Sequence, residues 1–393
     1  MAYNRLLHFF PFAEAWFASR CNSPFIDVVK GLFTHLFEPC RTVAVFLIRG
    51  SVNGEKTSIL FVGNSQKAHQ LAECIYPGTA KVSWLGTTLA RRSCQIDKSH
   101  IDAALIDVKK HSMARFLSLD DYLVLPTISF ALDLHQTMSQ VHRSMSRRRR
   151  RDIKAISHQH YGYAISHCDL QDFDFFYWKM YRPYIERRFG QAAMFSPYDV
   201  LMGYYKRNGG IVFVTKRKRR LAGLLFQIRG DTVFALIYGI YYGNTSFAKN
   251  LAGTAALHFL IQWGKGQDLR WLDYGRTVPF FNNGVFRYKK EWGMAIRLHH
   301  DQPYCVLKLT PQNRKAISLL QNNPFIIYHK GELKGCLLRK SKPRIEELQR
   351  LWTQYSLPGL RSFTALFYDH GTHSINLSEF PTKGILESLS IGF

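Results

Sequence analysis

The chain has 393 residues, of which 46% are hydrophobic and 14% aromatic, so it can bury a sizeable core, and its composition excludes an intrinsically disordered protein. Its formal net charge of +25 indicates an anionic partner, and the charge alone does not choose among nucleic acid, anionic lipid, a phosphorylated donor and an acidic carrier protein. No apolar run reaches the length of a membrane span.

The cysteines and the N-terminal stretch bear on the compartment. The 7 cysteines are odd in number and never stand at C-x-x-C spacing, which argues against a disulfide framework and against a zinc ribbon. The N-terminal RLLHFFPFAEAW has too short an apolar region for a signal peptide, and it contains His8 and Pro11. We expect a cytoplasmic protein with reduced thiols and no metal, with peripheral association at a membrane as the alternative location.

Between Thr42 and Phe130 the chain alternates between expected strands and short helices. The apolar runs predict strands at 43–48, 58–62, 81–85, 103–108 and 122–125, and helices at 66–75 and around 113–117. This order is typical of a βαβ-type layered arrangement, so we assign 1–130 to an N-terminal α/β domain. Gly63-Asn64-Ser65 opens a helix, but it lacks the full glycine fingerprint of a dinucleotide site and favours a structural turn.

Five consecutive arginines, Arg147–Arg151, follow on an expected helix. The neutral interpretation is a solvated helical face, because side chains of consecutive residues cannot all point to one side. Guanidinium groups also suit phosphate or carboxylate ligands. We therefore predict an anion-contacting helix with Arg147, Arg148 and Arg151 as substrate-binding residues, for donor phosphates, RNA or a lipid headgroup.

The next stretch, Asp172–Gly190, crowds aromatic side chains on one helical face. Core packing is the default interpretation for these aromatics, whereas the interleaved arginines need a partner. We name Tyr181 and Arg187 as substrate-binding candidates in this segment. A further helix is expected from Ser196 to Tyr205, followed by a strand at 211–215.

The most ordered pattern runs from Arg220 to Leu298. Apolar runs at 221–228 and 232–240 flank a Gly-Asp turn and predict a β-hairpin. Helical spacing follows from Leu251 to Trp263, and then come a strand at 270–274, a basic-aromatic segment at 287–292 and a strand at 295–298.

This order of elements resembles the acyl-CoA-binding half of the GNAT acetyltransferase fold, and in its detail the Fem-type and related GNAT-like acyltransferases. The residues that carry the resemblance are Ala222-Gly223, Gly239, the helix after Asn250, Leu272–Gly275 and Phe286–Gly293. The resemblance implies an α/β (α+β) class with a GNAT-like mixed sheet flanked by helices. We assign 131–310 to this GNAT-like domain and 311–393 to an accessory segment packed on it.

The segment Asn250-Leu251-Ala252-Gly253-Thr254-Ala255 fits the family's Gln/Arg-x-x-Gly-x-Gly/Ala signature with asparagine in the first place. Unpaired backbone N–H groups at a helix start can hold a pyrophosphate, and small residues allow its close approach. The resemblance thus implies cofactor binding by Lys249, Asn250, Gly253, Thr254 and Ala255. The alternative, a packing glycine in an amphipathic helix, is about as well supported, and the short asparagine weakens the case for CoA.

No Ser-His-Asp or Cys-His pattern is present, and in this fold the acceptor usually attacks directly. Acyl transfer to an amine needs a proton path and a donor to the developing oxyanion. The candidates are Asp273 as proton acceptor and Tyr274 or Tyr238 as hydroxyl donors, with a turn-capping carboxylate as the equal alternative for Asp273. Lys289 and Lys290 resemble the lysine of the family's terminal segment and are named as substrate-binding, with surface lysines as the alternative.

We expect the protein to be an N-acyltransferase that moves an acyl group from a thioester donor, acyl-CoA, to an amine. The amine acceptor is an amino sugar, an amino acid or a peptide, and an acyl carrier protein, tRNA or an anionic membrane surface is a further possible partner. The two alternatives are an aminoacyl-tRNA-dependent Fem-type transferase and a non-catalytic binder of nucleic acid or membrane surface. The sequence leaves the oligomeric state open.

Overall fold

The computed structural model describes residues 42–52, 54–76, 78–89, 101–108, 122–125, 127–190, 193, 195–298, 304–309, 324–329, 332–339, 345–369 and 374–380. The expected helix around 113–117 and the N-terminal stretch lie outside these ranges. Among the helices within them, none has the length and apolar character to cross a membrane.

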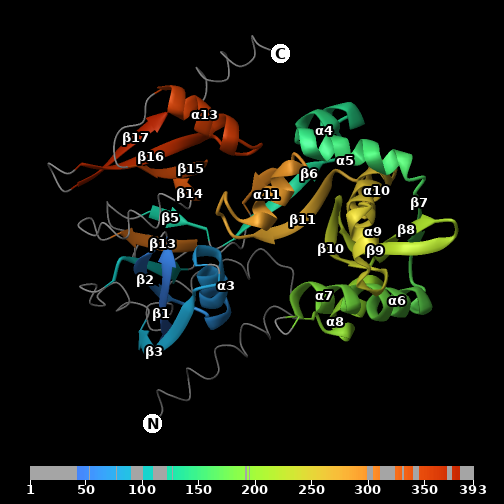
Figure 1. Ribbon diagram of the computed structural model, residues 1–393, viewed down its shortest axis with the longest axis horizontal. Helices are drawn as coiled ribbons and strands as arrows, with labels where there is room; N and C mark the ends of the chain where they lie inside the picture. Colours follow the sequence, from blue (N-terminus) through green and yellow to red (C-terminus); the bar gives the residue numbers. More distant parts are fainter. Residues whose placement is uncertain are drawn as a thin grey trace, which may run out of the picture.

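Two sheets organise the molecule, and they form its two lobes (Figure 1). The larger sheet has 10 strands in the order β17-β16-β15-β14-β5-β13-β4-β2-β1-β3. Its strands are β1 (Thr42–Val52), β2 (Glu55–Val62), β3 (Lys81–Leu89), β4 (Ala103–Val108), β5 (Tyr122–Val124), β13 (Tyr304–Leu309), β14 (Phe325–His329), β15 (Glu332–Arg339), β16 (Ser362–Asp369) and β17 (Ser374–Phe380). Helices α3 (Ser65–Ile75) and α13 (Ile345–Tyr355) pack with it.

The second sheet has 7 strands in the order β12-β6-β11-β10-β9-β8-β7. Its strands are β6 (Ile128–Asp133), β7 (Gly162–Ser166), β8 (Gly209–Lys216), β9 (Arg219–Arg229), β10 (Thr232–Ile240), β11 (Trp271–Thr277) and β12 (Ala295–Arg297). The flanking helices are α4 (Met138–Ser144), α5 (Arg147–His158), α6 (Leu170–Phe176), the π-helix η4 (Tyr177–Tyr181), α7 (Arg182–Phe189), α8 (Tyr198–Lys206), the 3-10 turn η6 (Tyr241–Gly243), α9 (Thr245–Lys249), α10 (Ala252–Gly266) and α11 (Gly284–Glu291).

The mixed α/β class is confirmed, and so is the order of elements expected from Arg220 to Leu298. The hairpin pairs Thr232 with Arg229 across Gly230, whose φ of 57° suits the tight turn. The helix, the strand, the basic-aromatic helix and the last strand follow as α10, β11, α11 and β12. These elements could be predicted because the spacing of apolar residues within each segment distinguishes a helix from a strand.

The sheets do not follow the expected linear division of the chain. The segment after 311 contacts the 131–310 domain, with the ring centroids of Phe281 and Tyr355 5.1 Å apart, but its strands extend the N-terminal sheet, with Ile327 of β14 paired to Val124 of β5. The sequence patterns also predict no strand at β15, β16 or β17, whereas Phe363 and Phe380 pair in an antiparallel ladder. Strand pairing between segments as far apart in sequence as β5 and β14 leaves no local signal, which is why the C-terminal strands could not be placed in the N-terminal sheet.

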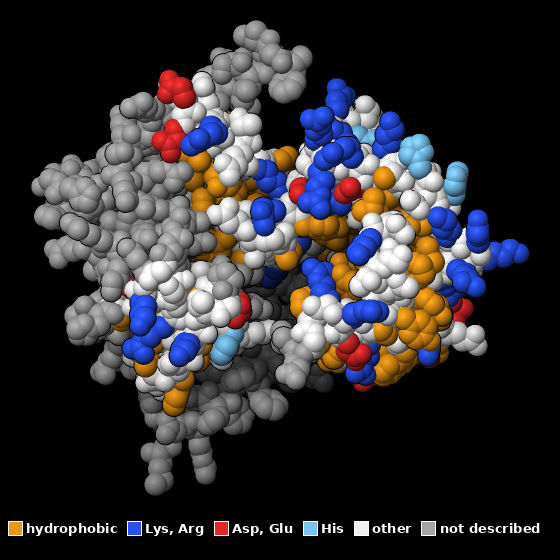
Figure 2. All heavy atoms as spheres, in the orientation of Figure 1, with side chains coloured by type: hydrophobic (Ala, Val, Ile, Leu, Met, Phe, Trp, Pro, Cys, Tyr) orange, Lys and Arg blue, Asp and Glu red, His pale blue; other side chains and the backbone are white. Residues whose placement is uncertain are grey.

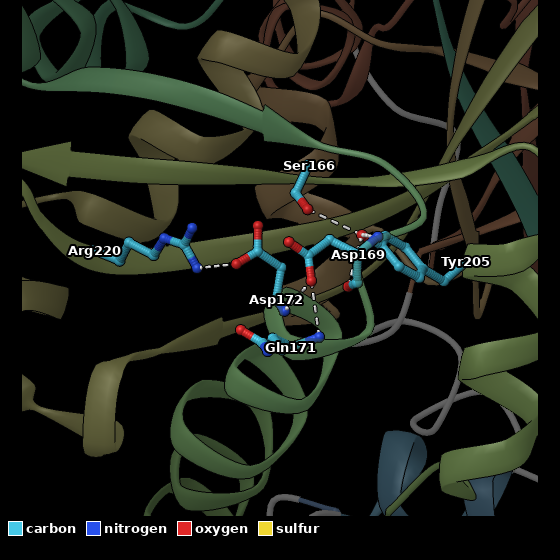
Figure 3. A network of polar contacts seen from close by, with 6 residues as sticks. All are labelled: Ser166, Asp169, Gln171, Asp172, Tyr205 and Arg220. Atoms are coloured by element: carbon cyan, nitrogen blue, oxygen red, sulfur yellow. Dashed lines mark hydrogen bonds and ion pairs between the residues drawn. The ribbon is translucent and has the colours of Figure 1, made fainter.

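A polar network ties the start of α6 to the neighbouring strands (Figure 3). Asp169 caps α6 by accepting from the backbone N–H groups of Gln171 and Asp172 at 2.9 and 3.3 Å. The Tyr205 hydroxyl lies 2.9 Å from Ser166 Oγ and accepts from the Asp169 N–H at 3.0 Å. Arg220 pairs with Asp172 at 2.5 Å. These contacts fix the helical layer that carries Tyr184 and Arg188 toward the sheet.

Gly239 sets how closely that helical layer approaches β10. A Cβ at Gly239 would lie 2.5 Å from the backbone carbon of Met180 and from the backbone nitrogen of Tyr181. The chain passes this point as the π-helix η4, a form that often marks functional sites. The glycine therefore permits backbone-to-backbone packing that any side chain would prevent.

Candidate active site

The neighbouring strands β10 and β11 run parallel but pair only over Thr232–Phe234 and Trp271–Asp273. Beyond this point β10 continues to pair with β9 and β11 with β6, so the two strands no longer hydrogen-bond to each other at their carboxyl ends. Helix α10 connects the end of β10 to the start of β11, which places its first turn at the same edge. Ligands of α/β sheets commonly bind at such carboxyl-end positions.

A tyrosine pair and an arginine meet at this edge. The hydroxyls of Tyr184 on α7 and Tyr238 on β10 lie 2.6 Å apart. Arg188 Nη1 donates to both oxygens, at 2.8 Å to Tyr184 and 3.1 Å to Tyr238. Since one hydroxyl proton bridges the pair and both oxygens already accept from Arg188, the other hydroxyl proton is free to be donated onward.

A second tyrosine pair stands next to the first. The rings of Tyr274 on β11 and Tyr288 on α11 have centroids 6.1 Å apart. Burial raises the pKa of Tyr274 well above its ordinary value, and its neighbour Tyr288 adds to the rise. Burial likewise raises the pKa of Tyr238, with Tyr184 contributing. Both hydroxyls therefore stay protonated at neutral pH and can act as hydrogen-bond donors.

The sequence did not predict four residues of this region: Arg149, Tyr184, Arg188 and Tyr288. The side chain of Arg149 is 5% exposed, and it pairs with Asp152 at 3.1 Å and Glu291 at 3.0 Å. Its guanidinium carbon lies 4.8 Å from the ring centroids of both Tyr288 and Trp292. The signal was available, because Arg149 and Ile156 stand seven residues apart, the i, i+7 spacing that places both on one buried side of a helix.

The same arginine reaches the first turn of α10. Arg149 Nη1 lies 3.4 Å from Thr254 Oγ1. This contact joins α5, α10 and, through Glu291, the end of α11 around the tyrosines. Arg149 is thus a positioning residue, because its positive charge is already paired with the carboxylates of Asp152 and Glu291.

The predicted phosphate-binding residues all lie at or just before the start of α10. Leu251 precedes the helix in the left-handed region, with φ of 67°, and provides no side-chain cap. Lys249 and Asn250 are exposed, and the Asn250 carbonyl accepts from the Tyr161 hydroxyl at 2.8 Å. Gly253 and Thr254 are half-buried, whereas Ala255 is fully buried and belongs to the core.

Asp273, Lys289 and Lys290 form hydrogen bonds with backbone groups, the first two of them at the end of β11. Asp273 Oδ1 accepts from the Gly275 N–H at 2.6 Å, which is the turn-capping contact weighed as the alternative to a proton acceptor. Lys289 is buried and donates to the carbonyls of Gly275 and Arg276 at 2.9 and 3.0 Å, and burial lowers its pKa to about 8. Lys290 donates to the carbonyl of Gln354 in the other lobe.

The remaining predicted residues divide between core and surface. Tyr181 is buried, and its hydroxyl accepts from the Ser196 N–H at 2.9 Å, so its role here is packing instead of the predicted substrate contact. Arg187 is exposed one position before Arg188, the residue that contacts the tyrosines. Arg147, Arg148 and Arg151 are exposed on α5, away from the buried Arg149.

No family model matches this sequence, and no curated protein matches it. Among solved structures the chain is similar to FemX, with 12% identity, a TM-score of 0.37, and coverage of 66% of this chain and 83% of that one. It is similar to L-PGS from Bacillus licheniformis, with 13% identity, a TM-score of 0.36, and coverage of 72% and 90%. A GCN5-related N-acetyltransferase from Sphaerobacter thermophilus shares 10% identity at a TM-score of 0.29, with coverage of 64% and 73%.

Proposed function

We propose that the protein is an N-acyltransferase that moves an acyl group from a thioester donor, acyl-CoA, to an amine. The observation that carries the proposal is the group of neutral tyrosine hydroxyls where β10 and β11 cease to pair. An extended donor arm can lie against the strand edges there, and the uncapped first turn of α10 offers backbone N–H groups to its phosphates.

The reaction assigned to this site is direct attack without a covalent enzyme intermediate. The amine nitrogen bonds to the thioester carbonyl carbon, the carbon–sulfur bond breaks, and the thiolate must gain the proton that the amine loses. The linked hydroxyls of Tyr184 and Tyr238 supply a path for it. Tyr184 accepts the amine proton as it passes its own to Tyr238, and Tyr238 gives its proton to the sulfur.

The neighbouring groups support this chemistry through position and charge. Tyr274 donates to the oxyanion that develops on the carbonyl, because its raised pKa keeps its proton in place. Arg188 holds the Tyr184–Tyr238 pair in register by donating to both oxygens. The acceptor class assigned here is a neutral primary amine of an amino sugar, amino acid or peptide.

The test is a thiol-release assay with acetyl-CoA and longer acyl-CoA donors against a panel of these amines. We expect amine-dependent release of free CoA that falls at least about tenfold in Tyr238→Phe, the scale of losing one positioned proton donor. The matched control is Tyr163→Phe, because Tyr163 is exposed and stacks on Phe259 with centroids 4.9 Å apart. Absence of thiol release with every donor and amine would reject the assignment.

A further inference from the structure

Helix α5 separates its arginines into one buried residue and an exposed basic face. At 100° per residue, Arg147, Arg150, Arg151 and Lys154 project from one side of the helix, and Arg149 and Ile156 from the opposite side. The first four are exposed and the last two buried. From Arg147 to Lys154 this side extends over about 11 Å of the helix axis. We call Arg147, Arg150, Arg151 and Lys154 the α5 basic face.

The charge of the α5 basic face has one sign. Within the described part of the chain, none of its four cations forms an ion pair. The nearby carboxylates of Asp152 and Glu291 are both paired with Arg149. In Figure 2 the Lys and Arg side chains gather on the part of the surface formed by α4 and α5. This face is therefore suited to an acidic partner.

The α5 basic face lies on the outer side of the helix whose inner side contacts the candidate active site. Arg149, on the inner side of the same helical turns, contacts Thr254 in the first turn of α10 at 3.4 Å. Tyr161, shortly after α5, donates to the Asn250 carbonyl just before α10. A partner seated on the α5 basic face is therefore separated from the assigned donor-phosphate site by the width of this helix, about 10 Å, and an arm from that partner has to pass around α5 to reach the site.

The composition of the face favours a protein over nucleic acid or membrane. Proteins that hold single-stranded nucleic acid add exposed aromatic stacking platforms to their cations, and α4 and α5 contain no Phe, Tyr or Trp. Surface helices that enter a membrane expose apolar side chains, whereas Ile156 of α5 is buried and Ile153 is half-buried. A compact cationic face without either feature fits an acidic helix by charge complementarity.

We propose that the α5 basic face docks an acidic acyl carrier protein, which delivers the acyl group as a thioester on its phosphopantetheine arm. This inference rests on the proposed acyl transfer and identifies the protein that carries the thioester donor. The arm's phosphodiester lies at the first turn of α10, and its thioester reaches the tyrosines between β10 and β11.

The experiment measures binding and turnover separately. Fluorescence anisotropy gives the Kd for a labelled holo acyl carrier protein at low and moderate salt, and product formation is followed with octanoyl carrier protein and octanoyl-CoA. The test variant is the double substitution Arg150→Glu/Lys154→Glu, at two exposed residues of the α5 basic face. Its control, Lys179→Glu/Lys206→Glu, makes the same change in net charge at exposed lysines of η4 and α8.

The proposal predicts salt-sensitive binding of the holo carrier that weakens at least about tenfold in the α5 variant and less than about twofold in the control. Turnover from octanoyl-CoA should be the same in both variants. Turnover from octanoyl-CoA without carrier binding would overturn the docking inference and leave the acyl transfer standing. Carrier binding without turnover from either donor would reject the acyl transfer and retain the docking face. Tighter binding of bulk tRNA or of anionic phosphatidylglycerol vesicles through the same two residues would overturn the carrier in favour of that partner.

Discussion

Gly253, in the first turn of α10, lies against the ring of Tyr238: a Cβ at Gly253 would stand 3.1 Å from Tyr238 Cε2. That approach is tight enough that the ring would have to move by a few tenths of an ångström. Because the Tyr238 hydroxyl lies 2.6 Å from that of Tyr184, a shift of the ring also disturbs the hydroxyl pair. The helix start and the proton path are therefore linked through one contact.

This contact predicts that Gly253→Leu abolishes most turnover while the protein stays folded. A leucine would displace Tyr238 and block the first turn of α10, and we expect a loss of at least about a hundredfold in kcat/KM, since misplacing reacting groups by about an ångström has that effect. The measurement combines steady-state kinetics with a thermal melt. Full activity in the leucine variant would show that this turn holds no part of the donor.

Arg149→Met should destabilise the protein by about 3 kcal/mol, because Asp152 and Glu291 would lose their common partner and the guanidinium would leave the Tyr288 and Trp292 rings. Chemical denaturation measures the free energy of unfolding. Arg151→Met, on the exposed side of the same helix, is the matched control and should change it by less than about 0.5 kcal/mol. Equal effects of the two substitutions would contradict the buried role of Arg149.

Tyr184→Phe and Tyr238→Phe should each lower kcat, and the double variant should be hardly worse than either single one. Both substitutions break the same hydroxyl chain, so their effects on a shared proton path are strongly non-additive. A double-mutant cycle on kcat measures this coupling. Simple additivity of the two losses would mean that the hydroxyls act separately.

Because His258 is buried, we expect the protein to lose stability in mildly acidic solution. Burial lowers the pKa of the His258 imidazole to about 4, with His142 as a second cause, and its Nδ1 has no hydrogen-bond partner in the described structure. Because the unfolded pKa is about 6.5, this residue favours the folded state above that pH, and its contribution disappears as the pH falls from 6.5 to about 4. Melting temperatures across this range should fall more steeply for the native protein than for His258→Phe, whereas parallel curves would assign the acid sensitivity elsewhere.

Gly239→Ala should prevent stable folding, because its Cβ would lie 2.5 Å from the backbone of Met180 and Tyr181. The comparison is Gly266→Ala at the end of α10, where a Cβ meets nothing within 4 Å and alanine favours the helix by about 0.5–1 kcal/mol. Circular dichroism and thermal melts distinguish the two. If Gly239→Ala melts like the native protein, η4 must be able to move away from β10 without cost.

The periodic signals of the sequence determined the local elements around the candidate site. The Gly-Asp turn with its apolar flanks specified the β9–β10 hairpin, and helical spacing specified α10, because a single segment carries these patterns. The family resemblance of this segment named Gly253 and Tyr238 as candidate site residues. The contact between Gly253 and Tyr238 could not be predicted from local patterns.

The tertiary structure alone decided which charged and polar side chains meet. It placed Arg149 inside and its neighbours outside, assigned Lys289 to the carbonyls of Gly275 and Arg276, and joined the C-terminal strands to the N-terminal sheet. It also brought Tyr184 and Arg188, which stand about fifty residues before Tyr238 in the chain, to within hydrogen-bond distance of that residue. The physical reason is that local propensity acts over a few residues, whereas burial, strand pairing and side-chain hydrogen bonds depend on distances that only the folded chain sets.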